Sequence, residues 1–310
     1  MLDTLITGLI HGNAYALVAV GVSLIFGVTN VVNFAQGSLV ALGAMTAWWL
    51  VVVGHQPLPV VIIGVLLVTG AVGYITDLFA VKPFGKAPPI AALLTTFAAS
   101  MILDRLSQLV FEPELRSFPE VLPTTNLSIG GVRFGTSDVV MFGLTLLVMG
   151  GLAVYLRYGR TGRAIRATAQ DTDAAQQMGV PVQRIRTLSF VLASALGGLA
   201  GIFVALYTGS TSPTAGMTIG LTAFVAATIG GLGSIPGAVV GGFVLGIVEA
   251  FGVYQFGDGV RDLITFGLLI LVLVFRPAGL FGKVSAIASE PMTGTFLGAG
   301  REIRLNAWQW

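Results

Sequence analysis

The sequence predicts an all-α polytopic membrane protein, and three observations indicate this class. Hydrophobic residues make up 55% of the 310 residues and charged residues only 10%, whereas soluble domains carry about a quarter charged residues. Mean hydropathy is +0.90, and apolar runs long enough to cross a bilayer recur along the chain. The formal net charge is only +2, which is too small for a nucleic-acid-binding protein. A cytosolic enzyme, a secreted domain and a nucleic-acid binder are therefore excluded, and the lack of cysteine excludes disulfides and thiolate sites.

The apolar runs predict about eight or nine transmembrane helices. The first run is expected to stay in the mature protein, because residues 1–4 lack the basic region of a cleavable signal. Two runs leave open whether they are full spans or half-helices: one begins at the polar Gln36, and the other is short and ends in a glycine pair. The candidate segments are 5–28, 35–53, 58–80, 89–110, 138–156, 187–208, 217–231, 236–255 and 259–275.

Basic residues in the loops predict the orientation of these spans. The loop 157–186 carries six of the 16 basic residues, so it is expected on the cytoplasmic side. Lys82 and Lys86 mark a second inside loop, and Arg276 and Lys283 mark an inside C-terminus. Loop 111–137 is then outside, and nine spans place the N-terminus outside. We therefore divide the chain into a transmembrane permease domain, 1–284, and a C-terminal tail, 285–310.

The outside loop 111–137 contains prolines that prevent a long helix. Residues 127–134 alternate around a Gly-Gly pair, a pattern that predicts a two-residue β-hairpin. One interpretation is a loop that caps a helix end, and the other is a docking surface for an external partner. The candidate docking residues carry both signs of charge and are Glu112, Glu114, Arg116, Glu120 and Arg133.

The inside loop 157–186 predicts two short helices. The first, 161–169, has a basic face, and Asp171 or Thr172 can cap the second at its N-terminus. Gly179 suits the position just past the end of that helix. Two short helices with small apolar residues bury little surface by themselves. They either rest on anionic lipid headgroups or insert into a groove on a cytoplasmic partner.

The sequence lacks the motifs of an enzyme or a metalloprotein. No G-x-x-x-x-G-K-[S/T] loop is present, so we expect no ATPase site in this chain. No His-Glu-x-x-His motif or carboxylate cluster indicates a metal, and the G-x-S-x-G nucleophile elbow is absent. Glu249 is an ionisable residue within a predicted span and has no charged neighbour there. It serves either structural hydrogen bonding or ion coupling.

Four ordered blocks of sequence resemble the permeases of branched-chain amino-acid ABC importers. The blocks are 27–37 continuing to 41–44, 162–167 continuing to Gly179, 230–238 with Glu249 downstream, and 276–282. The resemblance covers about residues 5–283 and is closest to the LivH-like type. It implies the ABC importer permease fold, a bacterial inner (plasma) membrane location, and a transport subunit that translocates branched-chain or related hydrophobic amino acids.

The same resemblance implies a set of partners and a coupling segment. The partners are a second, LivM-like permease, two cytoplasmic ATPase subunits that bind ATP and Mg, and an external solute-binding protein, all in membrane lipid, with no cofactor in this chain. Residues 173–179 are similar to the E-A-A-x-x-x-G coupling core, with Asp in place of Glu, although the I-x-L-P part of that motif is absent. The implied ATPase-coupling residues are Arg163, Arg166, Asp173, Ala174, Ala175 and Gly179.

Two interruptions of apolar segments, one in each half of the chain, indicate a solute path, because paired interruptions of this kind often form the binding site of a transporter. Unwound backbone at membrane depth is tolerated only where it is buried or lines a cavity. The other interpretation is that both are ordinary turns at the cytoplasmic ends of spans. The candidate path residues are Asn30, Asn33, Gln36, Gly231, Ser234 and Glu249.

Three further functions compete with a branched-chain amino-acid importer. A urea or short-amide ABC importer has the same architecture. A secondary transporter could be driven by an ion gradient through Glu249, and a passive channel is the third alternative. Copurification of ATPase subunits separates the importers from the other two. The tail 285–310 departs from the family pattern, and its basic and tryptophan residues either lie along the inner membrane surface or are disordered.

Overall fold

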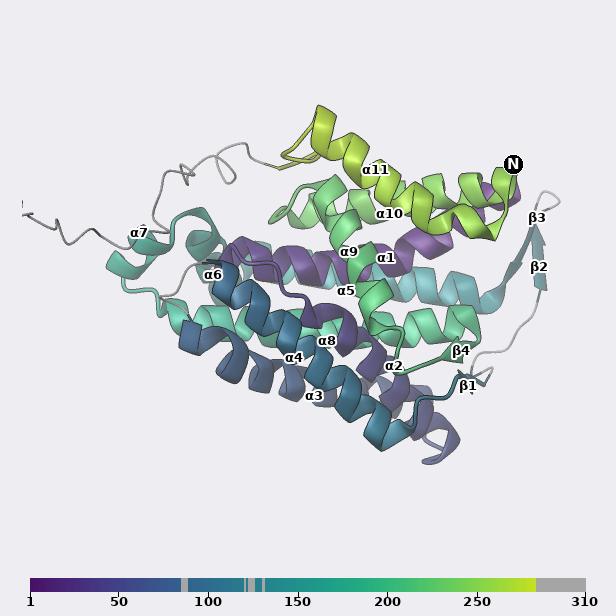
Figure 1. The fold of residues 1–310 in the computed structure, drawn as a ribbon, viewed down its shortest axis with the longest axis horizontal. Coiled ribbons are helices and arrows are strands. Elements are labelled where there is room, and N and C mark those ends of the chain that lie inside the picture. Colours follow the sequence, from purple (N-terminus) through teal and green to yellow (C-terminus); the bar gives the residue numbers. More distant parts are fainter. Residues whose placement is uncertain (85–88, 120, 122–125, 130–131, 283–310) are drawn as a thin grey trace, which may run out of the picture.

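A computed structural model describes the chain except for residues 85–88, 120, 122–125, 130–131 and 283–310 (Figure 1). The predictions for Lys86, Glu120, Lys283 and the tail 285–310 lie outside the described residues. Helices dominate the described part. They are α1 (Leu2–Thr29), α2 (Ala35–Val52), α3 (Leu58–Thr76), α4 (Pro89–Phe111), α5 (Thr136–Tyr158), α6 (Arg160–Gln170), α7 (Thr172–Gln177), α8 (Val182–Thr208), α9 (Gly216–Gly230), α10 (Ile235–Phe256) and α11 (Arg261–Phe275).

Seven helices of the described part are long and apolar enough to cross a membrane, which makes the chain a multi-pass membrane protein. The segment 35–53 is one of them, since α2 has 18 residues. Helices α9 and α11 have 15 residues each, or about 22 Å at 1.5 Å per residue. That is shorter than the hydrocarbon core of about 30 Å. The uncertain segment 217–231 is thus a short helix, and the expected eight or nine segments are seven long helices and two short ones.

Helix α1 lies at the centre of the bundle. In its most apolar window 78% of the residues are buried, against 22% in α4 and in α5, so α4 and α5 are peripheral. The seam between α1 and α10 is built from small residues: a Cβ added at Gly246 would collide with the backbone of Gly12. One turn along, a Cβ at Gly242 would collide with Ala16. Small residues let the two backbones approach, which is how membrane helices gain packing energy in the absence of a hydrophobic driving force.

The two ends of the bundle differ in structure (Figure 1). At one end lie the first residues of the chain and the hairpin of β2 (Asn126–Ile129) and β3 (Val132–Gly135). At the other end lie α6 and α7, which belong to the basic loop 157–186. The N-terminus is therefore on the same side as loop 111–137, as the charge distribution predicted. The predicted hairpin is confirmed, because Leu127 pairs with Phe134 in antiparallel register.

Candidate functional site: the coupling segment and the cavities beside it

Local sequence signals fold α7 as predicted. The Asp171 carboxylate accepts a hydrogen bond from the Ala174 amide at 2.9 Å, so Asp171 is the N-cap. At the other end Gly179 has φ +82°. Its amide donates to the Gln176 carbonyl at 3.0 Å, and the Val180 amide donates to the Ala175 carbonyl at 3.0 Å. This pair of bonds is a Schellman motif, and it directs the chain from α7 into α8.

One face of the coupling segment packs inside this chain, which sequence reasoning did not anticipate. Ile165 and Ala175 are buried, and a Cβ at Gly162 would collide with the backbone of Leu156 in α5. Ala175 is therefore not available on the outer surface. Among the predicted coupling residues, Arg163, Arg166, Asp173, Ala174 and Gly179 remain exposed.

Met178 is the residue that the motif comparison did not single out. Its side chain is 85% exposed at the tip of the coupling segment, beside the exposed Gly179. A flexible apolar side chain exposed to water is a common feature of protein contact surfaces. The only sequence signal for it was its place just before the capping glycine.

Asn30 and Ser234 meet beneath the coupling segment. Asn30 ends α1 in the left-handed conformation at φ 52°, with its amide bonded to the Phe26 carbonyl at 2.8 Å. Ser234 caps α10, because its hydroxyl accepts from the Gly237 amide at 3.2 Å. Both residues line a cavity of about 340 Å³ together with Arg166 and Ala169 of α6. The interruptions are thus turns at the α6 end of the bundle, and they are also brought together into one cavity.

Asn33 and Gln36 do not reach that cavity among its described lining residues. The Gln36 side chain is 1% exposed, and its Nε2 donates to the Ala193 carbonyl of α8 at 2.9 Å. A Cβ added at either Gly21 or Gly197 would lie 2.7 Å from this nitrogen. The two glycines therefore form the slot that holds the amide. In this conformation Gln36 joins three helices and does not face a path.

We expect the Gln36→Leu variant to lose stability, because the buried Ala193 carbonyl loses a partner and the branched side chain does not fit the slot. The lost hydrogen bond itself costs about 0.5–1.5 kcal/mol, because the Ala193 carbonyl lies within α8 and keeps its helical partner. The measurement is the midpoint of thermal unfolding in detergent. The control is Gln56→Leu, since Gln56 is exposed and its side-chain amide donates to the nearby Gly54 carbonyl at 2.8 Å. Equal midpoints for the two variants would contradict the structural role of Gln36.

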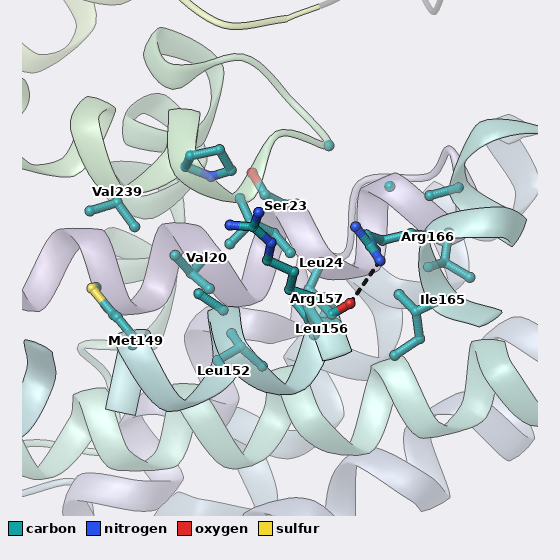
Figure 2. Close-up of a pocket in the computed structure, with 18 of the residues that line it drawn as sticks. Val20, Ser23, Leu24, Met149, Leu152, Leu156, Arg157, Ile165, Arg166 and Val239 are labelled. Carbon is teal, nitrogen blue, oxygen red and sulfur yellow. Dashed lines mark hydrogen bonds between the residues drawn. The ribbon is translucent and has the colours of Figure 1, made fainter. Parts of the chain in front are cut away.

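A larger groove of about 760 Å³ runs along α1 between α5 and α10 (Figure 2). Its described lining is mostly apolar, and the buried hydroxyl of Ser23 has no hydrogen-bond partner there. Figure 2 shows Arg166 pointing at α5, where its Nη2 donates to the Arg157 carbonyl at 3.0 Å. The groove shares Arg166 and Gly233 with the 340 Å³ cavity. Helix α6 therefore borders both spaces, and Arg166 lines them while it stays exposed.

On the outer surface, loop 111–137 is joined to the segment after α8 by a short antiparallel pair of strands. These strands are β1 (Arg116–Ser117) and β4 (Ser210–Thr211). Arg116 Nη2 lies 2.6 Å from the Glu112 carboxylate, and the guanidinium lies over the Trp48 ring at 5.3 Å. The carboxylates of Glu112 and Glu114 are 69% and 72% exposed. Of the predicted docking residues, Glu120 and the side chain of Arg133 lie outside the described residues. Arg116 also lies 3.9 Å from the Glu114 carboxylate, so among these three described residues two carboxylates share one guanidinium and the net charge is negative.

Glu249 has a cationic partner that its own span does not supply. Arg261, in the first turn of α11, places its Nε 3.2 Å from Glu249 Oε1, and the Tyr15 hydroxyl donates to the same oxygen at 3.1 Å. Arg261 also holds Asp258 at 2.9 Å. Within the part of the chain that the structure describes, no group of three or more His, Cys, Asp or Glu residues could hold a metal ion.

Comparisons with known proteins agree with this architecture. Residues 4–273 match the family described as "Branched-chain amino acid transport system / permease component". BraD of Pseudomonas aeruginosa, a high-affinity branched-chain amino acid transport system permease protein, is 34% identical over 91% of this chain and 96% of its own length. LivH of Escherichia coli, with the same description, is 30% identical over 91% of this chain and 96% of its own length.

A solved structure shows the same kind of fold. PsaBC from Streptococcus pneumoniae, in complex with Fab, matches with a TM-score of 0.50 at 13% identity. The match covers 89% of this chain and 92% of that chain, which shows an ABC permease fold. The family match spans nearly all described residues, so the chain belongs to the family of branched-chain amino acid transport system permease components.

Proposed function

We propose that this chain is the LivH-like permease subunit of an ABC importer that moves branched-chain amino acids across the bacterial inner membrane. The names of the family and of its relatives support the substrate class. The observation that carries the mechanism is the position of α6. This helix follows directly on α5, and its inner side borders the cavity that holds Asn30 and Ser234.

The coupling step follows from these contacts. In this step the ATPase subunits bind the exposed side of α6 and α7, at Arg163, Asp173, Ala174 and Gly179. Because Ile165 and Gly162 pack tightly on α5 and α1, a displacement of α6 moves the inner ends of these helices as well. The cavity lined by Asn30 and Ser234 changes shape at the same time, and this gates the inner end of the solute path.

The proposal includes a second, homologous permease and an external solute-binding protein. Membrane subunits of this kind have no energy source of their own, so the ATP and Mg are bound by the partner ATPases. The binding protein docks on the outer surface that carries Glu112 and Glu114. Association between charged surfaces is steered by electrostatics, and this affects the association rate more than the final affinity.

Reconstitution in proteoliposomes tests the proposed function. The chain is co-expressed with its partner ATPase, permease and binding-protein subunits, and uptake of radiolabelled leucine is measured. We expect saturable uptake that requires ATP inside the liposomes and that isoleucine and valine inhibit. Uptake driven by an ion gradient without ATP, or inhibition by urea but not by isoleucine, would overturn the proposal.

Charge reversal at Glu114 tests the docking surface. We expect Glu114→Lys to slow association of the binding protein several-fold at low ionic strength, because an exposed acidic charge on the docking face is replaced by a basic one. The difference should vanish at high salt, where the Debye length falls to about 3 Å. Surface plasmon resonance on the immobilised complex gives both rates, with the neutral Glu114→Gln variant as an intermediate. Unchanged association at low salt would place the docking surface elsewhere.

A further inference from the structure

A third, smaller cavity of about 180 Å³ lies in the part of the bundle where α1, α8, α9, α10 and α11 meet. Its volume is room for roughly six waters at about 30 Å³ each. That is well below the 300–1,000 Å³ or so of sites for drug-sized ligands. The cavity therefore fits one small solute. The polar side chains among its lining include His11, Tyr15, Tyr207, Thr222, Glu249 and Arg261.

Two buried polar atoms of residues that line this cavity have no hydrogen-bond partner. Tyr15 and Arg261 both bind the same oxygen of Glu249, Oε1, while Oε2 is buried without a partner. His11 lies one helical turn before Tyr15, so it shares its face of α1. The Nε2 of His11 is also buried and unpartnered, and the ring packs edge-on against Tyr207 with centroids 4.4 Å apart. Unpaired buried polar atoms are costly, so each of these two atoms calls for a hydrogen-bond partner such as a bound solute or an ordered water.

The charges around the cavity favour a cation. Glu249 and Asp262 line it, and Asp258 adjoins it through its ion pair with Arg261. The described residues at and beside the cavity therefore include three carboxylates and one guanidinium, and two of the carboxylates pair with that guanidinium. A primary ammonium group has three N–H donors, and the free Glu249 oxygen and the imidazole nitrogen of His11 are acceptors for them. The apolar side chains of Ala14, Val204 and Ile219 line the same space, which suits the aliphatic part of the same molecule.

We propose that this cavity binds the α-ammonium group of an aliphatic amino acid, with Glu249 as its counter-ion. The inference rests on the proposed function, because it identifies where the solute is recognised within this chain. It assigns Glu249 and His11 to direct contact with the solute. Tyr15 and Arg261 are positioning residues, since both bind Oε1 of Glu249 and leave Oε2 for the solute.

Thermal protection of the purified permease–ATPase complex, without binding protein, tests the site directly. A ligand that binds only the folded state raises the unfolding midpoint. We expect leucine and 3-methylbutylamine, which keeps the ammonium group, to raise the midpoint. We expect 4-methylpentanoate, which lacks that group, to have no effect. In Glu249→Gln the leucine concentration for half-maximal protection should rise at least tenfold.

The control for Glu249→Gln is Asp77→Asn. Asp77 is equally buried, and its Oδ2 accepts from Thr187 at 2.7 Å and pairs with Lys82 at 3.5 Å. Its variant removes a buried, paired carboxylate in the same way, so protection by leucine should stay unchanged. If Glu249→Gln does not assemble, Ala14→Leu decides the question, because it fills the cavity from α1 and leaves every charge in place. It should abolish protection as well.

The outcomes separate the two proposals. If the wild-type importer takes up leucine while neither leucine nor 3-methylbutylamine protects the complex, the site is wrong and the proposed function stands. The site is equally wrong if 4-methylpentanoate protects as well as leucine does, or if Ala14→Leu keeps full protection. If 3-methylbutylamine protects but leucine is not taken up, the ammonium site stands and the proposed function fails.

Discussion

We expect the Gly179→Val variant to assemble normally and to lose ATP-driven uptake by about tenfold or more. The reason is backbone conformation and not space. Gly179 has φ +82°, and no heavy atom lies within 4 Å of the position that a Cβ would take. A β-branched residue is strongly disfavoured in this conformation, at a cost on the order of 1–3 kcal/mol. The strain opens the Schellman motif and turns α7 and Met178 away from the orientation that the ATPases recognise.

Two controls make this expectation specific. Gly179→Asn should keep most of the uptake, because asparagine tolerates the left-handed region. Gly209→Val introduces the same kind of strain at the other end of α8, where φ is +63° and the space is also open, and it should leave coupling intact. The measurements are leucine uptake and ATP hydrolysis in the same proteoliposomes. Full uptake by Gly179→Val, or an equal loss in Gly209→Val, would contradict a coupling role for the α7 cap.

The second large effect is expected at the seam between α1 and α10. Gly246→Leu should abolish the folded, monodisperse protein, because even its Cβ would collide with backbone atoms of Gly8 and Gly12. Backbone cannot rotate away as a side chain can, so the whole helix pair must separate. Overpacking a core costs about 1–3 kcal/mol for extra methylene groups that side chains can accommodate, and this case exceeds that range.

The matched control is Gly267→Leu in α11, where nothing lies within 4 Å of an added Cβ. It should keep wild-type yield and an unfolding midpoint within a few degrees, since leucine is a better helix former than glycine. The measurements are the yield in size-exclusion chromatography and the unfolding midpoint in detergent. Normal yield of Gly246→Leu would show that α1 and α10 do not pack as closely as the structure places them.

Gly179 and Gly246 differ in whether the surrounding sequence reveals their structural role. The turn glycine, Gly179, was recognisable because its signal is local: an N-cap aspartate, a short helix and a following proline. The seam glycine, Gly246, carries no such local signal. With 42 glycines in the chain, only the helix that faces each one decides whether a side chain is tolerated there. Gly246 meets backbone, whereas Gly267 meets open space.

The candidate site likewise contains residues that their sequence motif places correctly and residues whose position depends on the fold. Exposed Asp173, Ala174 and Gly179 were placed in the coupling segment from their motif, and the structure leaves them accessible. Ala175 matched the same motif but is buried against its own chain, because the spacing of small residues does not state which face of α7 turns inward. Gln36 was grouped with Asn30 by closeness in sequence, yet a helix start separates them, and the glycines of α1 and α8 enclose only Gln36.

The sequence by itself determined the membrane class, the positions of the long spans, the caps of α7 and the family. These features depend on composition, on the thickness of the bilayer and on hydrogen bonds within a few residues, all of which can be read along one segment. Only the tertiary structure decided that Arg261 forms an ion pair with Glu249, that α6 borders the cavity of Asn30 and Ser234, and that His11 lines a cavity together with Glu249 and Arg261. Those relations join helices far apart in the chain. They depend on which small residues allow two backbones to approach, and that is a property of the assembled bundle.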